Sequence, residues 1–127
     1  MCPTILIVDD YDAVRTSLLD WFGTVFPDCA LAEARSGEEA VELALARPPD
    51  VILMDIGLPQ MNGIEAARRI KAAAPQVQVV MLTIHEAPEY QADAAAAGVT
   101  AYILKRQMYR ELIPTLQRLL SSSASPN

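Results

Sequence analysis

Short apolar runs and segments with helical spacing alternate along the chain. Most of the runs are rich in branched residues and have the length of strands that are buried on both faces, while the second alternates loosely, as a strand near the edge of a sheet does. The five predicted strands cover residues 4–8, 29–34, 51–54, 77–82 and 100–104. Alternating strands and helices favour a doubly wound α/β fold, in which a parallel sheet carries helices on both faces.

Capping residues and helix breakers predict where the helices begin and end. The patterns S-x-x-E at 36–39 and N-x-x-E at 62–65 are typical of helix N-termini. For the first helix we predict Asp12 as the cap and Gly23 as the stop. Gly98 is the predicted C-terminal cap of the fourth helix.

The last two predicted helices depart from a regular amphipathic pattern. Segment 86–97 is rich in Ala and has a weak apolar face, so we expect it to be the least firmly packed helix. Segment 108–120 is amphipathic but contains Pro114, and we expect a kink there. Residues 121–127 have nothing to bury and are predicted to be a linker or a disordered end, which leaves one domain over residues 1–120.

The composition fits one acidic globular domain. A chain of 127 residues with 52% hydrophobic residues is large enough for a single core. The formal net charge of −6 argues against direct binding to nucleic acid or to an anionic membrane, so a role on DNA requires another domain. No apolar run reaches the roughly 20 residues that cross a bilayer, and the N-terminus lacks the features of a signal peptide, so we predict a cytoplasmic protein.

Polar residues follow four of the predicted strands at the point where each strand ends. They are Asp9 and Asp10, Asp55, Thr83, and Lys105. The carboxyl ends of parallel strands meet at one edge of a sheet, and ligands bind in the crevice at that edge. We therefore expect three carboxylates, one hydroxyl and one ammonium group to lie close together.

This set of groups favours phosphoryl or metal chemistry. Three neighbouring carboxylates repel one another, and Mg²⁺, which prefers oxygen ligands, relieves that repulsion. A carboxylate such as Asp55, beside Mg²⁺ and Lys105, can attack a phosphoryl group because the two cations neutralise its oxygens, and Thr83 can donate to one of them. The alternative is a structural cluster in which Lys105 only neutralises the acids.

Four motifs, in order along the chain, resemble the response-regulator receiver domain of two-component signalling. They are IVDD at 7–10, MDIGLPQMNGIEAARRIK at 54–71, LT at 82–83 and AGVTAYILK at 97–105. The third predicted helix and the last motif are most similar to the NarL/FixJ subgroup. The resemblance covers about residues 4–120, and with it the predicted fold is flavodoxin-like, with strand order 2-1-3-4-5 and five helices.

The resemblance also implies a role for each acid of the cluster. Asp55 is the implied phosphoacceptor. Asp10, Asp55 and the backbone carbonyl of Gly57 are the implied ligands of Mg²⁺, and Asp9 has a supporting role.

Further positions match residues of the family that act on the phosphoryl group or respond to it. Lys105 and Thr83 match the pair that contacts the phosphoryl group, and Tyr102 matches the switch aromatic. We expect Thr83 and Tyr102 to act together as the switch. Positions that correspond to Gly57 and His85 flank the approach of water to the phosphoryl group in this family. Because Gly57 has no side chain, we expect His85 to control the lifetime of the phosphorylated state, although a solvated loop histidine is the simpler interpretation.

The predicted function is a switch that accepts a phosphoryl group from a sensor histidine kinase and changes its interaction surface. The predicted output is transcription through a helix-turn-helix domain absent from this chain, with homodimerisation on phosphorylation as a further possibility and no membrane partner. A stand-alone or phosphorylation-independent binding module remains the alternative. An Asp-dependent phosphatase of the haloacid dehalogenase type is disfavoured, because residues 55–57 lack the D-x-D arrangement.

Overall fold

The sheet has five parallel strands in the order β2-β1-β3-β4-β5, which confirms the predicted fold class. The computed structural model describes residues 3–124, with the backbone alone at 122–124. The strands are β1 (Thr4–Val8), β2 (Ala30–Ala34), β3 (Val51–Met54), β4 (Gln78–Thr83) and β5 (Ala101–Leu104). β3 lies in the middle of the sheet, and its residues are buried throughout, as the continuous apolar run indicates.

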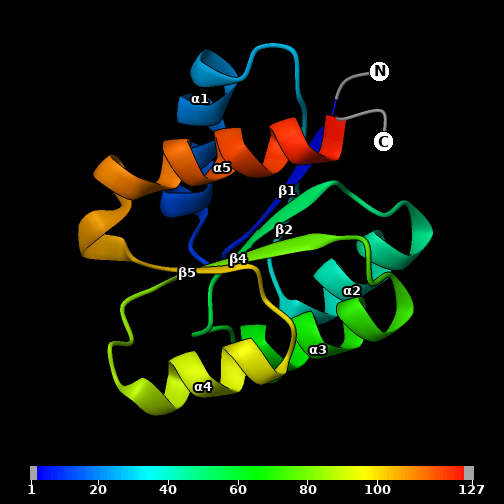
Figure 1. Cartoon of the computed structure of the whole chain (residues 1–127), viewed down its shortest axis with the longest axis vertical. Coiled ribbons are helices and arrows are strands. Elements are labelled where there is room, and N and C mark those ends of the chain that lie inside the picture. Colours follow the sequence, from blue (N-terminus) through cyan, green and yellow to red (C-terminus); the bar gives the residue numbers. More distant parts are fainter. Residues whose placement is uncertain (1–2, 125–127) are drawn as a thin grey trace.

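Five helices cover the two faces of this sheet (Figure 1). They are α1 (Asp12–Val25), α2 (Gly37–Ala46), α3 (Gly63–Ala73), α4 (Pro88–Ala96) and α5 (Met108–Ala124), and the 3-10 turn η1 (Lys105–Gln107) joins β5 to α5. α1 and α5 pack on one face, and α2, α3 and α4 pack on the other. Because all five strands are parallel, the loops that follow them all lie at the same edge of the sheet.

The side chains of each strand alternate between the two core layers. Ile5 and Ile7 of β1 face the layer of α1 and α5, where Phe22 is fully buried. Leu6 and Val8 face the layer of α2, α3 and α4. Because both faces are covered, the period of two is hidden in the sequence and only the apolar run remains visible.

Two of the predicted helix N-termini are confirmed by their hydrogen bonds. The Glu39 amide donates to Ser36 Oγ at 3.0 Å, and the Glu65 amide donates to Asn62 Oδ1 at 2.9 Å. Each cap satisfies one of the amides that the first turn of a helix leaves free. Gly98 has φ of +92° directly after the C-cap of α4, as predicted for a glycine that ends a helix.

The prediction was wrong at both ends of the first helix. Tyr11 is the N-cap of α1, without a side-chain bond, while Asp12 is already helical and its carboxylate accepts a hydrogen bond from Arg15. α1 also runs past Gly23 to Val25. The rings of Phe22 and Phe26 pack edge to face at 5.9 Å across this last turn, and such packing outweighs the low helix propensity of one glycine.

The last two helices also differ from their predicted bounds. α4 begins at Pro88, a residue that suits the first turn of a helix, and Ala94 is its buried residue, which agrees with its weak apolar face. α5 continues through Pro114 to Ala124, so residues 121–124 are helical and 125–127 lie outside the described residues. The kink at Pro114 stays a prediction, and so does the linker where it covers residues 125–127, while residues 121–124 belong to α5. No helix within residues 3–124 is long and apolar enough to cross a membrane.

Candidate functional site

The three predicted acids lie together beyond the carboxyl ends of β1 and β3. Asp9 is 2% exposed and Asp55 is 9% exposed, while Asp10 is partly exposed. One carboxylate oxygen from each residue lies within 4.8 Å of the others. Since β1 and β3 are hydrogen-bonded neighbours whose residues Val8 and Met54 pair, the sheet itself brings the following residues side by side.

Two of the three carboxylates are held in the same way. The amide of Tyr11 donates to Asp9 Oδ1 at 2.9 Å, and the amide of Gly57 donates to Asp55 Oδ1 at 3.1 Å. The second oxygens face one ammonium group, because Lys105 Nζ lies 3.6 Å from Asp9 Oδ2 and 3.5 Å from Asp55 Oδ2. Each carboxylate thus has one oxygen fixed by the backbone and the other directed toward the centre of the site.

The site places Asp9 in surroundings that disfavour its charge. Burial raises the pKa of Asp9 above its usual value of 3.8, and the nearby carboxylates of Asp55 and Asp10 raise the pKa further. The hydrogen bond from Tyr11 and the charge of Lys105 act in the opposite direction and do not outweigh burial. Additional positive charge at this position would therefore be stabilising.

Asp10 supplies the observation that tests whether a cation fits. Its Oδ1 atom is buried and has no hydrogen-bond partner among the described residues. A buried polar atom without a partner is unfavourable, and a ligand is one way to satisfy it. The side-chain atoms of the cluster that could bind a metal ion are all carboxylate oxygens, the type of ligand that Mg²⁺ prefers. The residues present therefore fit a Mg²⁺ ion.

Two glycines hold the loop that follows Asp55. A Cβ atom on Gly63, the first residue of α3, would lie 2.1 Å from the backbone oxygen of Asp55. A Cβ atom on Gly37, the first residue of α2, would lie 2.6 Å from the backbone oxygen of Met61. The starts of both helices therefore press directly on this loop. The N-x-x-E pattern at 62–65 indicates only a helix start and carries no signal of this contact.

Thr83 and Tyr102 are both connected to His85. Thr83 ends β4, is fully buried, and accepts a hydrogen bond on Oγ1 from the His85 amide at 3.1 Å. Tyr102 of β5 donates its hydroxyl hydrogen to the His85 carbonyl at 2.7 Å. Burial, and secondarily Tyr90, raise the pKa of the Tyr102 phenol, so the hydroxyl stays a donor. The two residues predicted to act together are therefore joined through one peptide segment.

The His85 side chain is packed rather than simply solvated. Its ring stacks on Tyr90 of α4 with centroids 4.4 Å apart. Its Nε2 atom would lie 3.9 Å from a Cβ atom on Gly57, so the imidazole stands beside the loop of Asp55. A cavity of about 220 Å³ is lined in part by Thr83 and Lys105.

Comparison with known proteins agrees with this arrangement of acids, hydroxyl and lysine. A sequence model described as the response regulator receiver domain matches residues 5–117. The chain belongs to this family. The predicted resemblance is thereby confirmed.

Several relatives of this receiver domain are response regulators. The response regulator GacA of Pseudomonas aeruginosa is 29% identical over 117 residues, covering 92% of this chain and 55% of GacA. The response regulator protein VraR of Staphylococcus aureus is 35% identical over 120 residues, covering 93% of this chain and 56% of VraR. The receiver domain thus spans about half the length of these curated relatives.

A solved structure supports the subgroup. The crystal structure of a two-component response regulator of the LuxR family, from an Aurantimonas species, matches with a TM-score of 0.88 and 29% identity. The match covers 96% of this chain and 87% of that chain. Together with VraR, it supports the predicted NarL/FixJ-like subgroup.

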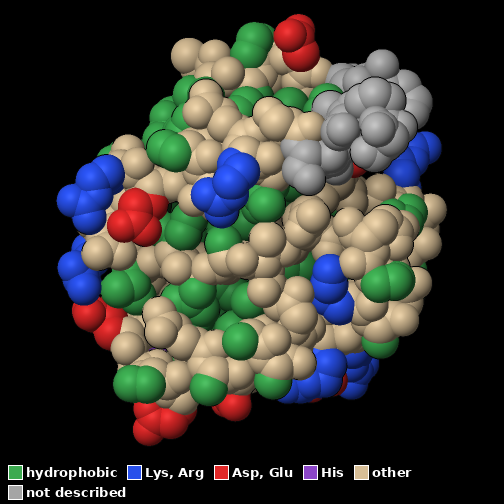
Figure 2. Space-filling view, viewed as in Figure 1, with side chains coloured by type: hydrophobic (Ala, Val, Ile, Leu, Met, Phe, Trp, Pro, Cys, Tyr) green, Lys and Arg blue, Asp and Glu red, His purple; other side chains and the backbone are tan. Residues whose placement is uncertain are grey.

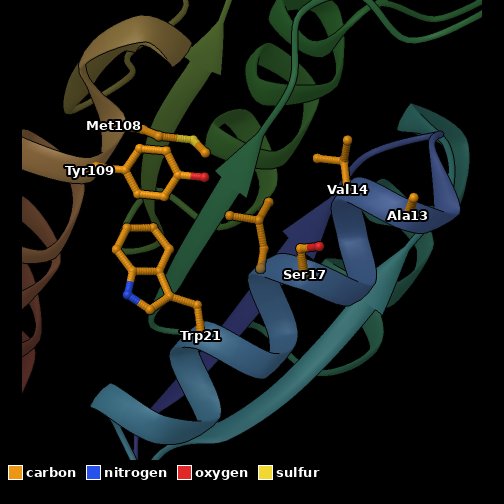
Figure 3. A pocket seen from close by; sticks show the side chains of 7 residues that line it. Ala13, Val14, Ser17, Trp21, Met108 and Tyr109 are labelled. Atoms are coloured by element: carbon orange, nitrogen blue, oxygen red, sulfur yellow. The ribbon is translucent and has the colours of Figure 1, made fainter.

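An apolar groove lies between α1 and α5 of the receiver domain (Figure 3). It has a volume of about 360 Å³ and is lined by Ala13, Val14, Ser17, Leu18, Trp21, Met108 and Tyr109. The rings of Trp21 and Tyr109 lie side by side with centroids 5.5 Å apart and planes tilted by 44°, and Tyr109 is 78% exposed. The groove offers an apolar surface of the kind that an amphipathic helix covers.

Proposed function

We propose that this receiver domain is a signalling switch in which Asp55 accepts a phosphoryl group from a sensor histidine kinase. The observation that carries the proposal is the position of Asp55 Oδ2, which lies 3.5 Å from Lys105 Nζ while the Gly57 amide holds Oδ1. One carboxylate oxygen of Asp55 forms the new bond to phosphorus. The bond from phosphorus to the kinase imidazole nitrogen breaks, and that nitrogen keeps the electron pair and takes up a proton from solvent.

Mg²⁺ is the proposed cofactor, held by Asp10, Asp55 and the backbone carbonyl of Gly57, with Asp9 in support. The unpartnered Oδ1 atom of Asp10 supports this assignment. When bound, the ion supplies positive charge that offsets the charge of the phosphoryl oxygens. Lys105 supplies a second positive charge, because its Nζ lies 3.6 Å from Asp9 Oδ2 and 3.5 Å from Asp55 Oδ2. The domain assists its own phosphorylation in this way and has no separate substrate.

Thr83 and Tyr102 are the proposed switch. A phosphoryl group on Asp55 gives the Thr83 hydroxyl a charged acceptor, which binds more strongly than a neutral one. Movement of Thr83 changes the position of His85, whose amide and carbonyl bond Thr83 and Tyr102. Tyr102 then adjusts on the face formed by α4, β5 and α5, where Figure 2 shows hydrophobic side chains gathered between α4 and α5.

The proposed partners follow from the family and from the surface. The histidine kinase is expected from membership of the response regulator receiver family. We propose that the groove between α1 and α5 receives a helix of that kinase, because it is apolar and lies on the helix that begins just after Asp9 and Asp10. We propose transcription as the output, through a DNA-binding domain in the same protein, and a cytoplasmic location.

The decisive experiment is an intact-mass measurement after incubation with acetyl phosphate and Mg²⁺. The parent protein should gain the mass of one phosphoryl group, and Asp55→Asn should gain none. Asp93→Asn, which changes an exposed aspartate of α4, is the matched control and should behave as the parent does. An unchanged phosphoryl adduct in Asp55→Asn would contradict the assignment of Asp55 as the phosphoacceptor. A parent protein without any adduct would favour the phosphorylation-independent alternative.

A further inference from the structure

Arg15 is a buried cation that joins three segments beside the acidic cluster. It lies on the inner side of α1 and is 3% exposed. Its Nε donates to Glu33 Oε1 of β2 at 2.7 Å, and its Nη2 donates to Asp12 Oδ1 at 2.5 Å. Its Nη1 donates to the backbone oxygen of Asp9 at 2.8 Å. One planar guanidinium therefore connects α1, β2 and the end of β1.

The charge of Arg15 is already matched by the first two of these partners. The hydrogen bonds that Arg15 donates to Glu33 and Asp12 raise the pKa of the guanidinium, which therefore stays charged despite its burial. The contact with Asp9 involves a backbone carbonyl and not a carboxylate. The third bond thus serves to hold the backbone in place rather than to neutralise the acids.

The loop after β1 needs such a restraint. Three carboxylates converge within 4.8 Å, and among the described residues Lys105 is the cation recorded in contact with them. The remaining repulsion acts to separate the acids. The Asp9 amide bonds the Ala34 carbonyl at 3.2 Å, and Arg15 bonds the Asp9 carbonyl, so the two sides of this residue are tied to β2 and to α1.

We propose that Arg15 is a positioning residue, which holds the Asp9 backbone so that Asp9 and Asp10 face Asp55 before the cation binds. The inference rests on the proposed Mg²⁺ site and deepens it. Without Arg15, the acids can move apart, and cation binding must first restore their arrangement. Partners that orient metal ligands in this way typically contribute about 10-fold to 100-fold in affinity. Arg15 itself touches neither the cation nor the reacting atoms.

The test compares the Mg²⁺ affinity of the parent with that of Arg15→Met, which keeps a side chain of similar length without the donors. Affinity is measured by titrating Mg²⁺ and following the backbone amide signals of Tyr11 and Gly57 by NMR. We expect about tenfold weaker binding in the variant. Leu18→Ala is the matched control, because Leu18 lies on the same helix, is 3% exposed and packs in the layer of α1 and α5. It should lose stability but keep the parent affinity.

Three further variants separate position from charge and from folding. Arg15→Lys keeps the charge but cannot bond three partners in one plane, so its affinity should stay low. Glu33→Gln replaces the charged acceptor of Arg15 Nε by a neutral amide, which weakens this hydrogen bond and should weaken Mg²⁺ binding in the same direction. Glu42→Gln, at an exposed position of α2, should not weaken it. The pair of glutamates provides the test if Arg15→Met does not fold.

The proposal is overturned if Arg15→Met binds Mg²⁺ within twofold of the parent, or if Arg15→Lys regains the parent affinity. It is equally overturned if Leu18→Ala loses as much affinity as Arg15→Met. The parent titration is made first and concerns the proposed function alone. A parent that shows no Mg²⁺-dependent shift at Tyr11 and Gly57 contradicts the cation site itself, whereas differences among the variants concern Arg15.

Discussion

Replacing Gly63 by Ala adds one methyl group against the backbone of the proposed phosphoacceptor. The new Cβ atom would lie 2.1 Å from the Asp55 oxygen, 2.9 Å from the Asp55 carbonyl carbon and 2.9 Å from Met54 Cγ. Real Cβ atoms essentially never approach closer than 3.0 Å. Because the nearest obstacle is backbone rather than a flexible side chain, either α3 or the segment at Asp55 must move.

Two opposing terms set the size of the effect. Overpacking of this kind costs about 1–3 kcal/mol, and a backbone obstacle belongs at the upper end of that range. Alanine is better than glycine inside a helix by up to about 1 kcal/mol, less at the first helical position. We expect a net loss of about 2 kcal/mol in the free energy of unfolding. For a domain of this size, that lowers the thermal midpoint by roughly 8 °C.

Gly23→Ala is the matched control, since it makes the same substitution inside α1, where no atom lies within 4 Å of the added Cβ. It should raise the free energy of unfolding by about 0.5–1 kcal/mol. The assay is urea or thermal unfolding of both variants and the parent, followed by circular dichroism. A second readout is the rate of phosphorylation by acetyl phosphate, which a displaced Asp55 should lower in Gly63→Ala only. The reasoning is refuted if Gly63→Ala is as stable as the parent.

Three further predictions concern the site. Burial raises the pKa of Asp9 above 3.8, so the folded state binds this proton more tightly than the unfolded chain and stability falls as pH rises through the folded pKa. Asp9→Asn should therefore raise the urea midpoint at neutral pH without Mg²⁺, with no gain below pH 3.8, and an equal gain at all pH values would contradict this. Thr83→Ala should still accept a phosphoryl group on Asp55 but lose the phosphorylation-dependent change in self or partner association, measured by sedimentation; association equal to that of the parent would disprove the switch. His85→Ala should change the rate of phosphate loss, followed by intact mass over time, because the imidazole stands beside Gly57; an unaltered rate would remove His85 from that role.

The pattern of apolar residues was sufficient to predict the sheet. The inner strands β1, β3 and β4 are short runs buried on both faces, and such runs can hardly be placed anywhere but inside a doubly wound sheet. Once the strands are parallel, whatever follows each strand must meet at one edge. For this reason the sequence alone brought Asp9, Asp10, Asp55, Thr83 and Lys105 to one site, and the distances among the acids and Lys105 bear out that placement.

Local signals failed at both ends of α1, where a contact of a buried side chain on the same helix decided the outcome. Asp is a residue type that often caps a helix. The Asp12 carboxylate instead accepts a hydrogen bond from Arg15, and Tyr11 occupies the cap position. Gly is a residue type that often ends a helix. α1 nevertheless continues past Gly23, because the rings of Phe22 and Phe26 pack together across its last turn. In both cases the deciding contact involves a buried side chain, and burial is a property of the whole fold rather than of a short window of sequence.

Tertiary structure alone decided which groups hold the site in position. Glu33 and Asp9 meet Arg15 because β1 and β2 pair in parallel register. Arg15 and Glu33 are 18 positions apart, and no local pattern signals their contact. The approach of Gly63 to the Asp55 carbonyl depends on where α3 packs, to within a fraction of an ångström. Residue types and spacing determine which chemistry is present at the edge of the sheet. Atomic distances are set by the close packing of the interior, because side chains from all elements must fill one volume together.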